Sequence, residues 1–185
     1  MTTYLDAILD HHRSVAASDR RSIDSLMSEA ASVPPARPFA AALRAEPGLA
    51  VIAEIKRRSP SKGDLFVGLD PGLVAKAYEQ GGASCLSVLT DEPHFGGSVA
   101  DLQAARAACS LPVLRKDFTV SERDVLDARI MGADCVLLIA AALDKHELRS
   151  FHELANGVGL DVLVEIHDEA ELAVALQIGA TIVGV

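Results

Sequence analysis

Short apolar runs alternate with longer amphipathic stretches along most of the chain. From Leu49 onward there are six such runs, each short and rich in branched side chains, and helical signals lie between them. This pattern predicts buried strands joined by helical crossovers, and therefore an α/β fold with a parallel sheet. The predicted strands are residues 49–53, 85–89, 112–114, 135–139, 162–164 and 181–183.

The first 48 residues have a different pattern. Two sets of side chains at helical spacing predict two short helices, and a third helical stretch follows three prolines. We therefore expect an N-terminal helical extension over residues 1–48 and a sheet-containing part over residues 49–185. The helical sets are Leu5, Ile8, Leu9 and His12, then Ile23, Leu26, Met27 and Ala30, then residues 39–43.

Ionisable residues follow several of the predicted strands. In a closed barrel the carboxyl ends of all strands surround one mouth, whereas distant strands of an open doubly wound sheet do not meet. We therefore favour a (β/α)8 TIM barrel. It is incomplete, because about 250 residues are typical of this fold and the chain reaches only a sixth strand before an apolar ending. The residues are Glu54 and Lys56, Asp91 and Glu92, Lys116 and Asp117, and Glu165.

Composition narrows the possible partners. The formal net charge of −9 disfavours nucleic acid and anionic membranes, because such a surface repels polyanions. No apolar run approaches the ~20 residues that span a bilayer, and the first six residues do not have the order of a secretory signal. The cysteines, Cys85, Cys109 and Cys135, lack metal-ligand spacing and suit buried thiols. We expect a soluble, cytoplasmic protein with neither a membrane nor a nucleic-acid partner.

Four charged residues are candidates for chemistry. Glu54 and Lys56 are two apart on one strand and so share a face, where the carboxylate can orient the ammonium. Lys116 shares a face with Leu114, and Glu165 shares one with Leu163. The alternatives are a structural ion pair, a solvated lysine and a helix-capping carboxylate, although Asp168 is the better cap. The histidines show neither metal-ligand spacing nor an associated nucleophile, so no metal site is predicted.

One segment carries most of a resemblance to a known family. Residues 54–63 read Glu-Ile-Lys-Arg-Arg-Ser-Pro-Ser-Lys-Gly, which is similar to the signature of the indole-3-glycerol-phosphate synthases. The resemblance covers essentially the whole chain, including the helical extension. Further matching stretches are residues 87–92 with Phe95, Gly97 and Ser98, then residues 114–118, 133–139 and 163–167.

The resemblance implies a carbon–carbon lyase, a carboxy-lyase of tryptophan biosynthesis that needs no cofactor. Such enzymes convert 1-(2-carboxyphenylamino)-1-deoxyribulose 5-phosphate into indole-3-glycerol phosphate, with ring closure and loss of carbon dioxide and water. By resemblance, Lys116 is the general acid and Glu165 serves the ring nitrogen and later proton transfer. Lys56 binds the substrate's carboxylate or phosphate, and Glu54 orients the lysines. The matching substrate-lining positions are Ser59, Pro60, Phe95, Phe118, Leu137 and Ile139.

The resemblance ends with the chain. The family has an Asn and an Arg directly after the sixth strand and phosphate-binding loops after two later strands, and none of these residues is present in the 185-residue sequence. We therefore expect the 185 residues alone to expose sheet edges, to be unstable and to have little activity.

Two other functions fit the pattern less well. A related phosphate-binding barrel, such as a phosphoribosylanthranilate isomerase, needs an acid–base pair but no decarboxylation pocket. A non-catalytic binding module would lack turnover altogether. A monomer and association with other tryptophan-pathway enzymes are both compatible with the sequence.

Overall fold

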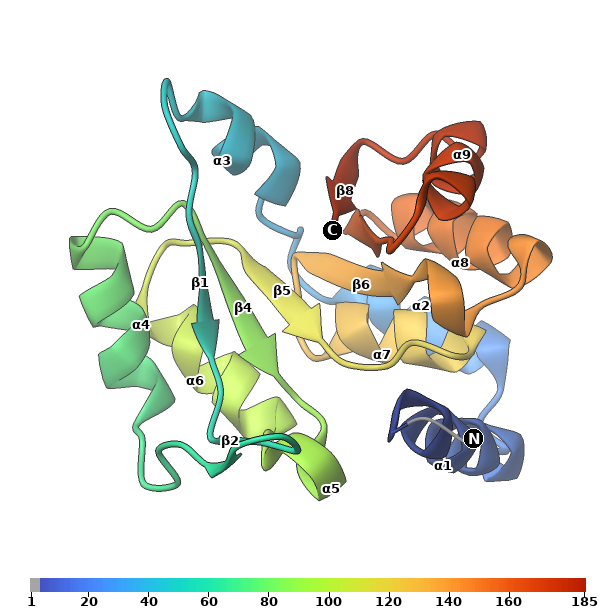
Figure 1. The fold of residues 1–185 in the computed structure, drawn as a ribbon, viewed down its shortest axis with the longest axis horizontal. Helices are drawn as coiled ribbons and strands as arrows, with labels where there is room; N and C mark the ends of the chain where they lie inside the picture. Colours follow the sequence, from blue (N-terminus) through green and yellow to red (C-terminus); the bar gives the residue numbers. More distant parts are fainter. Residues whose placement is uncertain (1–3) are drawn as a thin grey trace. The chain divides into compact units, whose positions relative to one another are not determined.

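The computed structural model describes residues 4–185, so the first three residues of the stretch compared with a secretory signal lie outside it. Figure 1 shows its helices and strands. The helices are α1 (Tyr4–Ser18), α2 (Ile23–Ser32), α3 (Phe39–Ala45), α4 (Pro71–Gln80), α5 (Glu92–Phe95), α6 (Val99–Ala108), α7 (Glu122–Ile130), α8 (Lys145–Gly157) and α9 (Glu169–Gln177), with a 3-10 turn η1 (Ala140–Ala142). The strands are β1 (Ile52–Ile55), β2 (Arg58–Ser59), β3 (Gly63–Asp64), β4 (Cys85–Leu89), β5 (Val113–Lys116), β6 (Cys135–Ile139), β7 (Asp161–Glu165) and β8 (Ile182–Gly184).

The order of the strands distinguishes a barrel from an open sheet. Within residues 4–185 the main sheet has six strands, in the order β1-β4-β5-β6-β7-β8. The β1–β4, β4–β5 and β7–β8 ladders are parallel. A doubly wound sheet reverses its strand order at a switch point, whereas barrel strands follow the chain without reversal. The predicted α/β fold, a TIM barrel that is incomplete at six strands, is therefore confirmed.

The chain forms two compact units. The first-strand unit, residues 34–117 and 131–135, contains β1, β4 and β5. Helices α4 and α6 pack against each other in this unit; α4 also contacts β1, and α6 contacts β4 and β5. All five residues of β4 are buried and four of them are apolar, as expected for an inner strand with helices packed against it.

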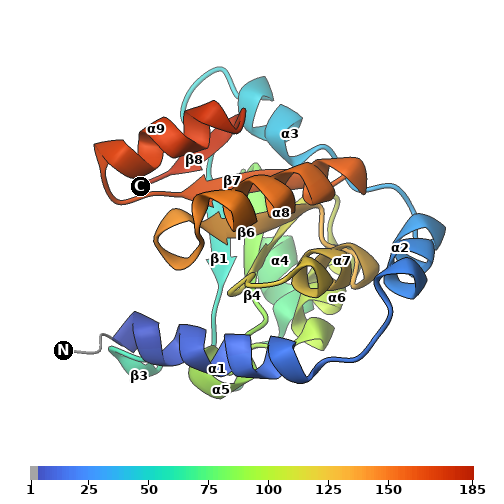
Figure 2. The same cartoon turned by 90° about the vertical axis from the view of Figure 1, so that its right-hand side faces the viewer.

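The last-strand unit, residues 1–33, 118–130 and 136–185, contains the first two predicted helices. Helix α2 packs against α7, and α8 contacts both α7 and β7 (Figure 2). Leu26 and Ala30 of α2 are buried with Leu126 of α7, as the predicted apolar face requires. Met27, assigned to the same face, is instead 39% exposed.

Glycines end the helices that lead into the sheet. Gly82, Gly132 and Gly179 have φ values of 84°, 95° and 81°. Residues other than glycine rarely adopt this left-handed conformation, so these three glycines fit the turns from helix to strand. Strand β1 begins three residues later than the predicted start at residue 49, which is 91% exposed. Of the three cysteines expected to be buried thiols, Cys109 is only partly buried.

A buried carboxylate, Asp134, ties the amino-terminal side of the first-strand unit together. Its side chain has no exposed surface and accepts hydrogen bonds from the backbone N–H groups of Arg37, at 2.7 Å, and Val113, at 2.8 Å. Arg106 Nη2 of α6 lies 2.9 Å from the same carboxylate. Asp134 also donates its own backbone N–H to the Val113 carbonyl. One side chain thus joins the chain before α3, helix α6 and strand β5.

Replacement of Asp134 by alanine is predicted to destabilise the fold by about 3–5 kcal/mol, because Arg106 and two backbone donors lose a buried partner. The free energy of unfolding from urea titration measures this loss. The exposed Asp10 of α1 is the matched control, and Asp10→Ala should change stability by less than about 0.5 kcal/mol. A loss below about 1 kcal/mol for Asp134→Ala would contradict the role of this carboxylate.

A buried histidine makes the last-strand unit sensitive to acid. His152 of α8 is 8% exposed, and Asn156 Nδ2 lies 3.2 Å from its Nδ1. Burial lowers the pKa of His152 below its ordinary value of 6.5, because removing the ring from water penalises the imidazolium. The unfolded chain therefore binds a proton at His152 more readily than the folded chain does.

Stability is predicted to fall as the pH drops from neutrality through 6.5 and on through the lower folded-state pKa of His152. The free energy of unfolding, measured by urea titration at neutral and mildly acidic pH, reports this loss. His152→Gln removes the titrating group and should reduce the loss on acidification. Equal losses in the two proteins would exclude His152 as its source.

Candidate active site

The strand register of the first-strand unit brings the two candidate lysines to one face. Glu54 pairs with Ser87, and Leu89 pairs with Lys116. One residue beyond β1, Lys56 comes level with Leu89 and therefore with Lys116. Paired residues of parallel strands point to the same side, and two strand spacings of about 4.8 Å separate the lysine backbones. Glu54, Lys56 and Lys116 thus share one face of the sheet, as their parity in the sequence predicts.

Glu54 and Lys56 form an ion pair between Oε1 and Nζ. Their side chains are 35% and 29% exposed, so both groups are partly desolvated and still reach solvent. The hydroxyl of Tyr78 on α4 donates to the Glu54 carbonyl at 3.1 Å and fixes this peptide from the helix side. The predicted orienting contact between carboxylate and ammonium is present.

The loop after Lys56 is held by Arg57, its first residue. Arg57 Nε and Nη2 donate to the two carboxylate oxygens of Asp101 at 2.8 and 2.9 Å, and Nη1 donates to the carbonyls of Val67 and Leu69. The hydrogen bond to Asp101 raises the pKa of Arg57 above its ordinary value. Arg57 therefore closes the loop and anchors it to α6, a role that sequence spacing did not indicate.

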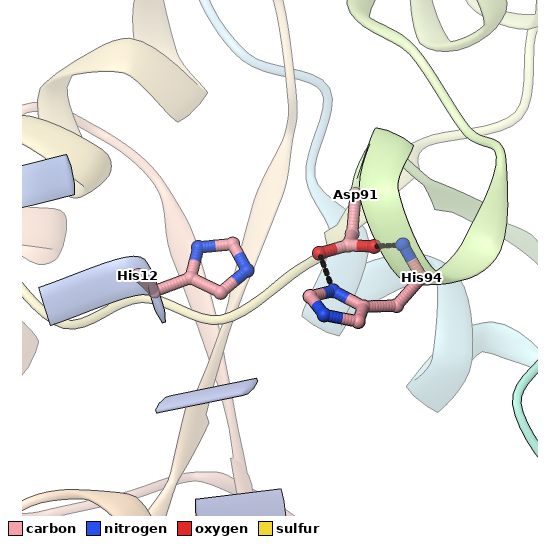
Figure 3. Close-up of side chains that lie close together, drawn as sticks. All are labelled: His12, Asp91 and His94. Carbon is pink, nitrogen blue, oxygen red and sulfur yellow. Dashed lines mark hydrogen bonds and ion pairs between the residues drawn. The ribbon is translucent and has the colours of Figure 1, made fainter. Parts of the chain in front are cut away.

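The substrate-lining candidates of the first-strand unit lie on neighbouring elements. Ser59 is in β2, Pro60 follows it, and β2 contacts the short helix α5 that ends at Phe95. The buried Asp91 caps α5. Its Oδ1 accepts from the backbone N–H groups of His94 and Phe95 at 2.7 and 3.0 Å, and its Oδ2 lies 3.0 Å from His94 Nδ1 (Figure 3). Asp91 thereby fixes the main chain that carries Phe95.

The remaining candidates belong to the last-strand unit. Glu165 is the final residue of β7 and pairs with Gly184. Leu163 and Glu165 are half-buried, whereas Val162 and Val164 between them are buried, so Glu165 does share a face with Leu163. Asp168, not Glu165, caps α9, as expected. The predicted approach of Glu165 to Lys116 joins two units and stays a prediction.

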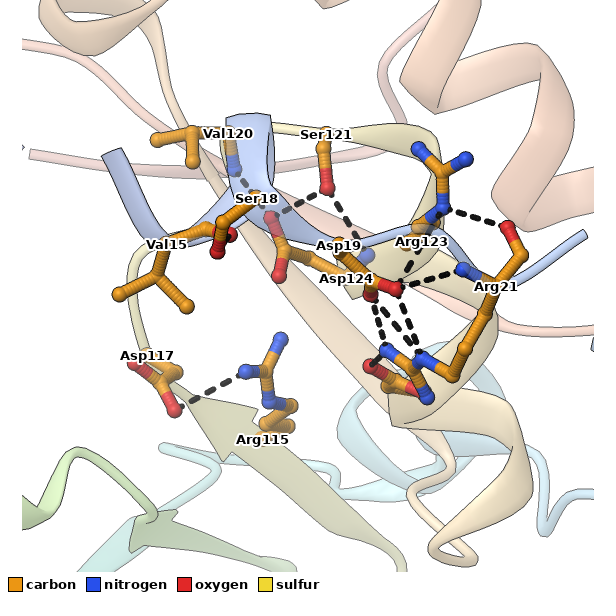
Figure 4. A network of polar contacts seen from close by, with 11 residues as sticks. Val15, Ser18, Asp19, Arg21, Arg115, Asp117, Val120, Ser121, Arg123 and Asp124 are labelled. Atoms are coloured by element: carbon orange, nitrogen blue, oxygen red, sulfur yellow. Dashed lines mark hydrogen bonds and ion pairs between the residues drawn. The ribbon is translucent and has the colours of Figure 1, made fainter. Parts of the chain in front are cut away.

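Three apolar substrate-lining candidates also lie in the last-strand unit. Leu137 and Ile139 alternate along β6 and are 2% and 7% exposed, and the Phe118 ring lies 5.2 Å from the ring of His12. Helix α1, which carries His12, is fixed by Arg13, whose Nη1 lies 2.9 Å from Glu147 Oε1. Arg21 is held between Asp19 and Asp127 at the end of α1 (Figure 4). Helix α1 and the turn after it are therefore held by ion pairs, in addition to the packing of α2 against α7.

Fold and site together define a class of protein. They describe a (β/α) barrel enzyme with lysine and glutamate side chains at the carboxyl ends of parallel strands, which suits acid–base chemistry on an anionic substrate. The indole-3-glycerol phosphate synthase family model matches residues 5–185. The chain belongs to this family. The predicted class, a carbon–carbon lyase of tryptophan biosynthesis, is thereby confirmed.

Individual relatives agree. An indole-3-glycerol phosphate synthase from Hyphomonas neptunium is 47% identical, with 100% of this chain and 72% of the relative covered. Indole-3-glycerol phosphate synthase 2 from Streptomyces coelicolor is 57% identical over 84% of this chain, which spans 60% of that relative's length. The indole-3-glycerol phosphate synthase from Chlorobium phaeovibrioides is 50% identical, with 98% of this chain and 72% of the relative covered.

A solved structure supports the fold alone. The Bacillus subtilis YkuI protein, with an EAL domain, superposes with a TM-score of 0.50 at 20% sequence identity, covering 77% of this chain and 38% of that one.

None of the helices in residues 4–185 is long and apolar enough to cross a membrane.

Gly97 lies in a backbone contact that admits no side chain. A Cβ at Gly97 would lie 2.1 Å from the carbonyl oxygen of Leu89, the residue that pairs with Lys116. We predict that Gly97→Ala costs about 1–3 kcal/mol in the free energy of unfolding, because backbone must move. Gly157 in α8 has open space around it, so Gly157→Ala is the matched control and should be neutral or stabilising. Equal effects of the two substitutions on thermal unfolding would contradict this contact.

Proposed function

We propose that the chain acts as an indole-3-glycerol phosphate synthase in which Lys116 is the general acid of ring closure. The supporting observation is the register that sets Lys116 and Lys56 on one face of β1, β4 and β5. The substrate is 1-(2-carboxyphenylamino)-1-deoxyribulose 5-phosphate. Lys116 donates a proton to its ketone oxygen as the ring carbon attacks, so that the developing alkoxide is neutralised.

Lys56 binds an anionic group of the same substrate and acts in the later loss of water. Its ion pair with Glu54 keeps the ammonium directed along the shared face. The two lysines present two positive charges to a molecule that carries a carboxylate and a phosphate. Glu54 acts through Lys56 and is a positioning residue.

Glu165 serves the ring-nitrogen side and the later proton transfer. The ring carbon that attacks the ketone loses its carboxylate as carbon dioxide, which restores the aromatic ring before water leaves. The apolar walls for the aromatic ring come from Phe95, Phe118, Leu137 and Ile139, with Ser59 and Pro60 at the loop after β1. Such walls keep water away and strengthen each charge–charge interaction within the site. The reaction requires no cofactor in this scheme.

The setting of the reaction is part of the same proposal. The enzyme works in the cytoplasm on a phosphorylated small molecule, either as a monomer or in association with other tryptophan-pathway enzymes. Residues 1–48 form the helical extension and residues 49–185 the barrel part. The ion pair of Arg13 with Glu147 on α8 supports a stabilising role for the extension.

Replacement of Lys116 by alanine is predicted to lower kcat by about 10²–10⁴-fold, because the ketone loses its proton donor. Indole-3-glycerol phosphate formation in the intact enzyme measures the change, and far-ultraviolet circular dichroism confirms the fold. Lys76→Ala on the exposed side of α4 is the matched control and should leave kcat unchanged. Near-normal turnover by folded Lys116→Ala would remove Lys116 from the chemistry.

A further inference from the structure

A buried polar cluster lies on the side of β5 opposite Lys116. The Thr90 hydroxyl donates to Asp117 Oδ2, and Arg115 Nη2 lies 3.0 Å from the same oxygen (Figure 4 draws the Arg115–Asp117 pair). Thr90, Arg115 and Asp117 are 8%, 8% and 7% exposed. Arg115 and Asp117 are two residues apart and share the face that Lys116 does not occupy. The two neighbours of Lys116 in the chain are thus bonded to each other.

The cluster also crosses to the neighbouring strand. Leu89 pairs with Lys116, and the backbone N–H of Thr90 donates to the Lys116 carbonyl at 3.2 Å. Thr90 therefore contacts the Lys116 peptide through its main chain and the following residue through its side chain. The main chain at Lys116 is held on both sides at the carboxyl end of β5.

Stability alone does not account for such a cluster. A buried ion pair loses hydration free energy that its Coulombic attraction often only balances, and apolar replacements of similar volume are often as stable. The contribution of the cluster is geometric, because charge-assisted hydrogen bonds are directional and fix the ends of β4 and β5 relative to each other. The residue between the two charges is the proposed acid.

We propose that Thr90, together with the Arg115–Asp117 pair, positions Lys116 for proton transfer. This inference rests on the proposed function of Lys116 and adds three positioning residues to it. None of the three side chains lies on the face of Lys116, so none is assigned contact with the substrate. Each acts by setting where the lysine side chain leaves the strand.

We expect the three positioning residues to change the rate of the chemical step rather than the affinity for the substrate. A general acid must lie within hydrogen-bonding reach of the oxygen that it protonates. A displacement of about 1 Å can cost on the order of 10²-fold in rate. Anionic groups of the substrate are bound elsewhere on the shared face, through Lys56, so substrate affinity depends less on the exact position of Lys116.

The hydroxyl of Thr90 provides the sharpest test. Thr90→Val keeps the shape and removes the donor to Asp117, whereas Thr90→Ser keeps the donor. Steady-state kinetics of the intact enzyme, normalised to folded protein, should show kcat of Thr90→Val lowered by about 10-fold or more. KM should stay within about twofold of the parent value, and Thr90→Ser should restore most of kcat. Should Thr90→Val not fold, Thr90→Ala removes the same donor without an added methyl group.

The outcomes separate this inference from the proposed function. A parent-like kcat for Thr90→Val, or an equal loss in Thr90→Ser and Thr90→Val, overturns the positioning role while Lys116 keeps its own. A rise in KM with unchanged kcat also overturns it, because the cluster would then serve binding. If Lys116→Ala retains turnover, the general-acid assignment itself fails. A loss of kcat that serine rescues supports the inference.

Discussion

The hydrogen bonds between Asp134 and Val113 hold the amino end of β5 in register with its surroundings. Asp134 accepts from the Val113 N–H and donates its own N–H to the Val113 carbonyl, so the strand can neither slide nor turn over. A slip of one residue would move every side chain of the strand to the opposite face. Lys116 is three residues further along β5, and its place beside Leu89 follows from this contact.

The amino end of β5 carries structural contacts, whereas its carboxyl end carries the candidate catalytic residues. At the amino end, the buried Asp134 is bonded to the half-buried Arg37 and Arg106, which suits a structural role. At the carboxyl end, Lys116 and the nearby Glu54–Lys56 pair reach the surface of the sheet. Barrel enzymes separate these roles in the same way, since their loops of variable sequence follow the carboxyl ends of the strands.

The sequence predicted the features that depend on residues close together in the chain. Strand alternation placed Glu54 with Lys56 and Glu165 with Leu163. The sequence did not indicate the partners of Arg57, Asp134 or Thr90. The bonds of Arg57 to Asp101, of Thr90 to Asp117, and of Asp134 to Val113 and Arg37 join residues between 21 and 97 positions apart, so no spacing rule reveals them. The start of β1 also differs from the predicted one. The apolar run begins at residue 49, but Leu49 is exposed and the strand begins only at Ile52.

Paired arginines explain how a chain with a net charge of −9 can carry cationic chemistry at one place. Arg57 and Arg115 each adjoin a candidate lysine in the sequence, and each is bonded to a carboxylate, Asp101 or Asp117. An uncompensated guanidinium a few ångströms away would repel the ammonium and favour its deprotonation. Pairing makes both arginines structural anchors, whereas the proposed chemistry falls to Lys56 and Lys116.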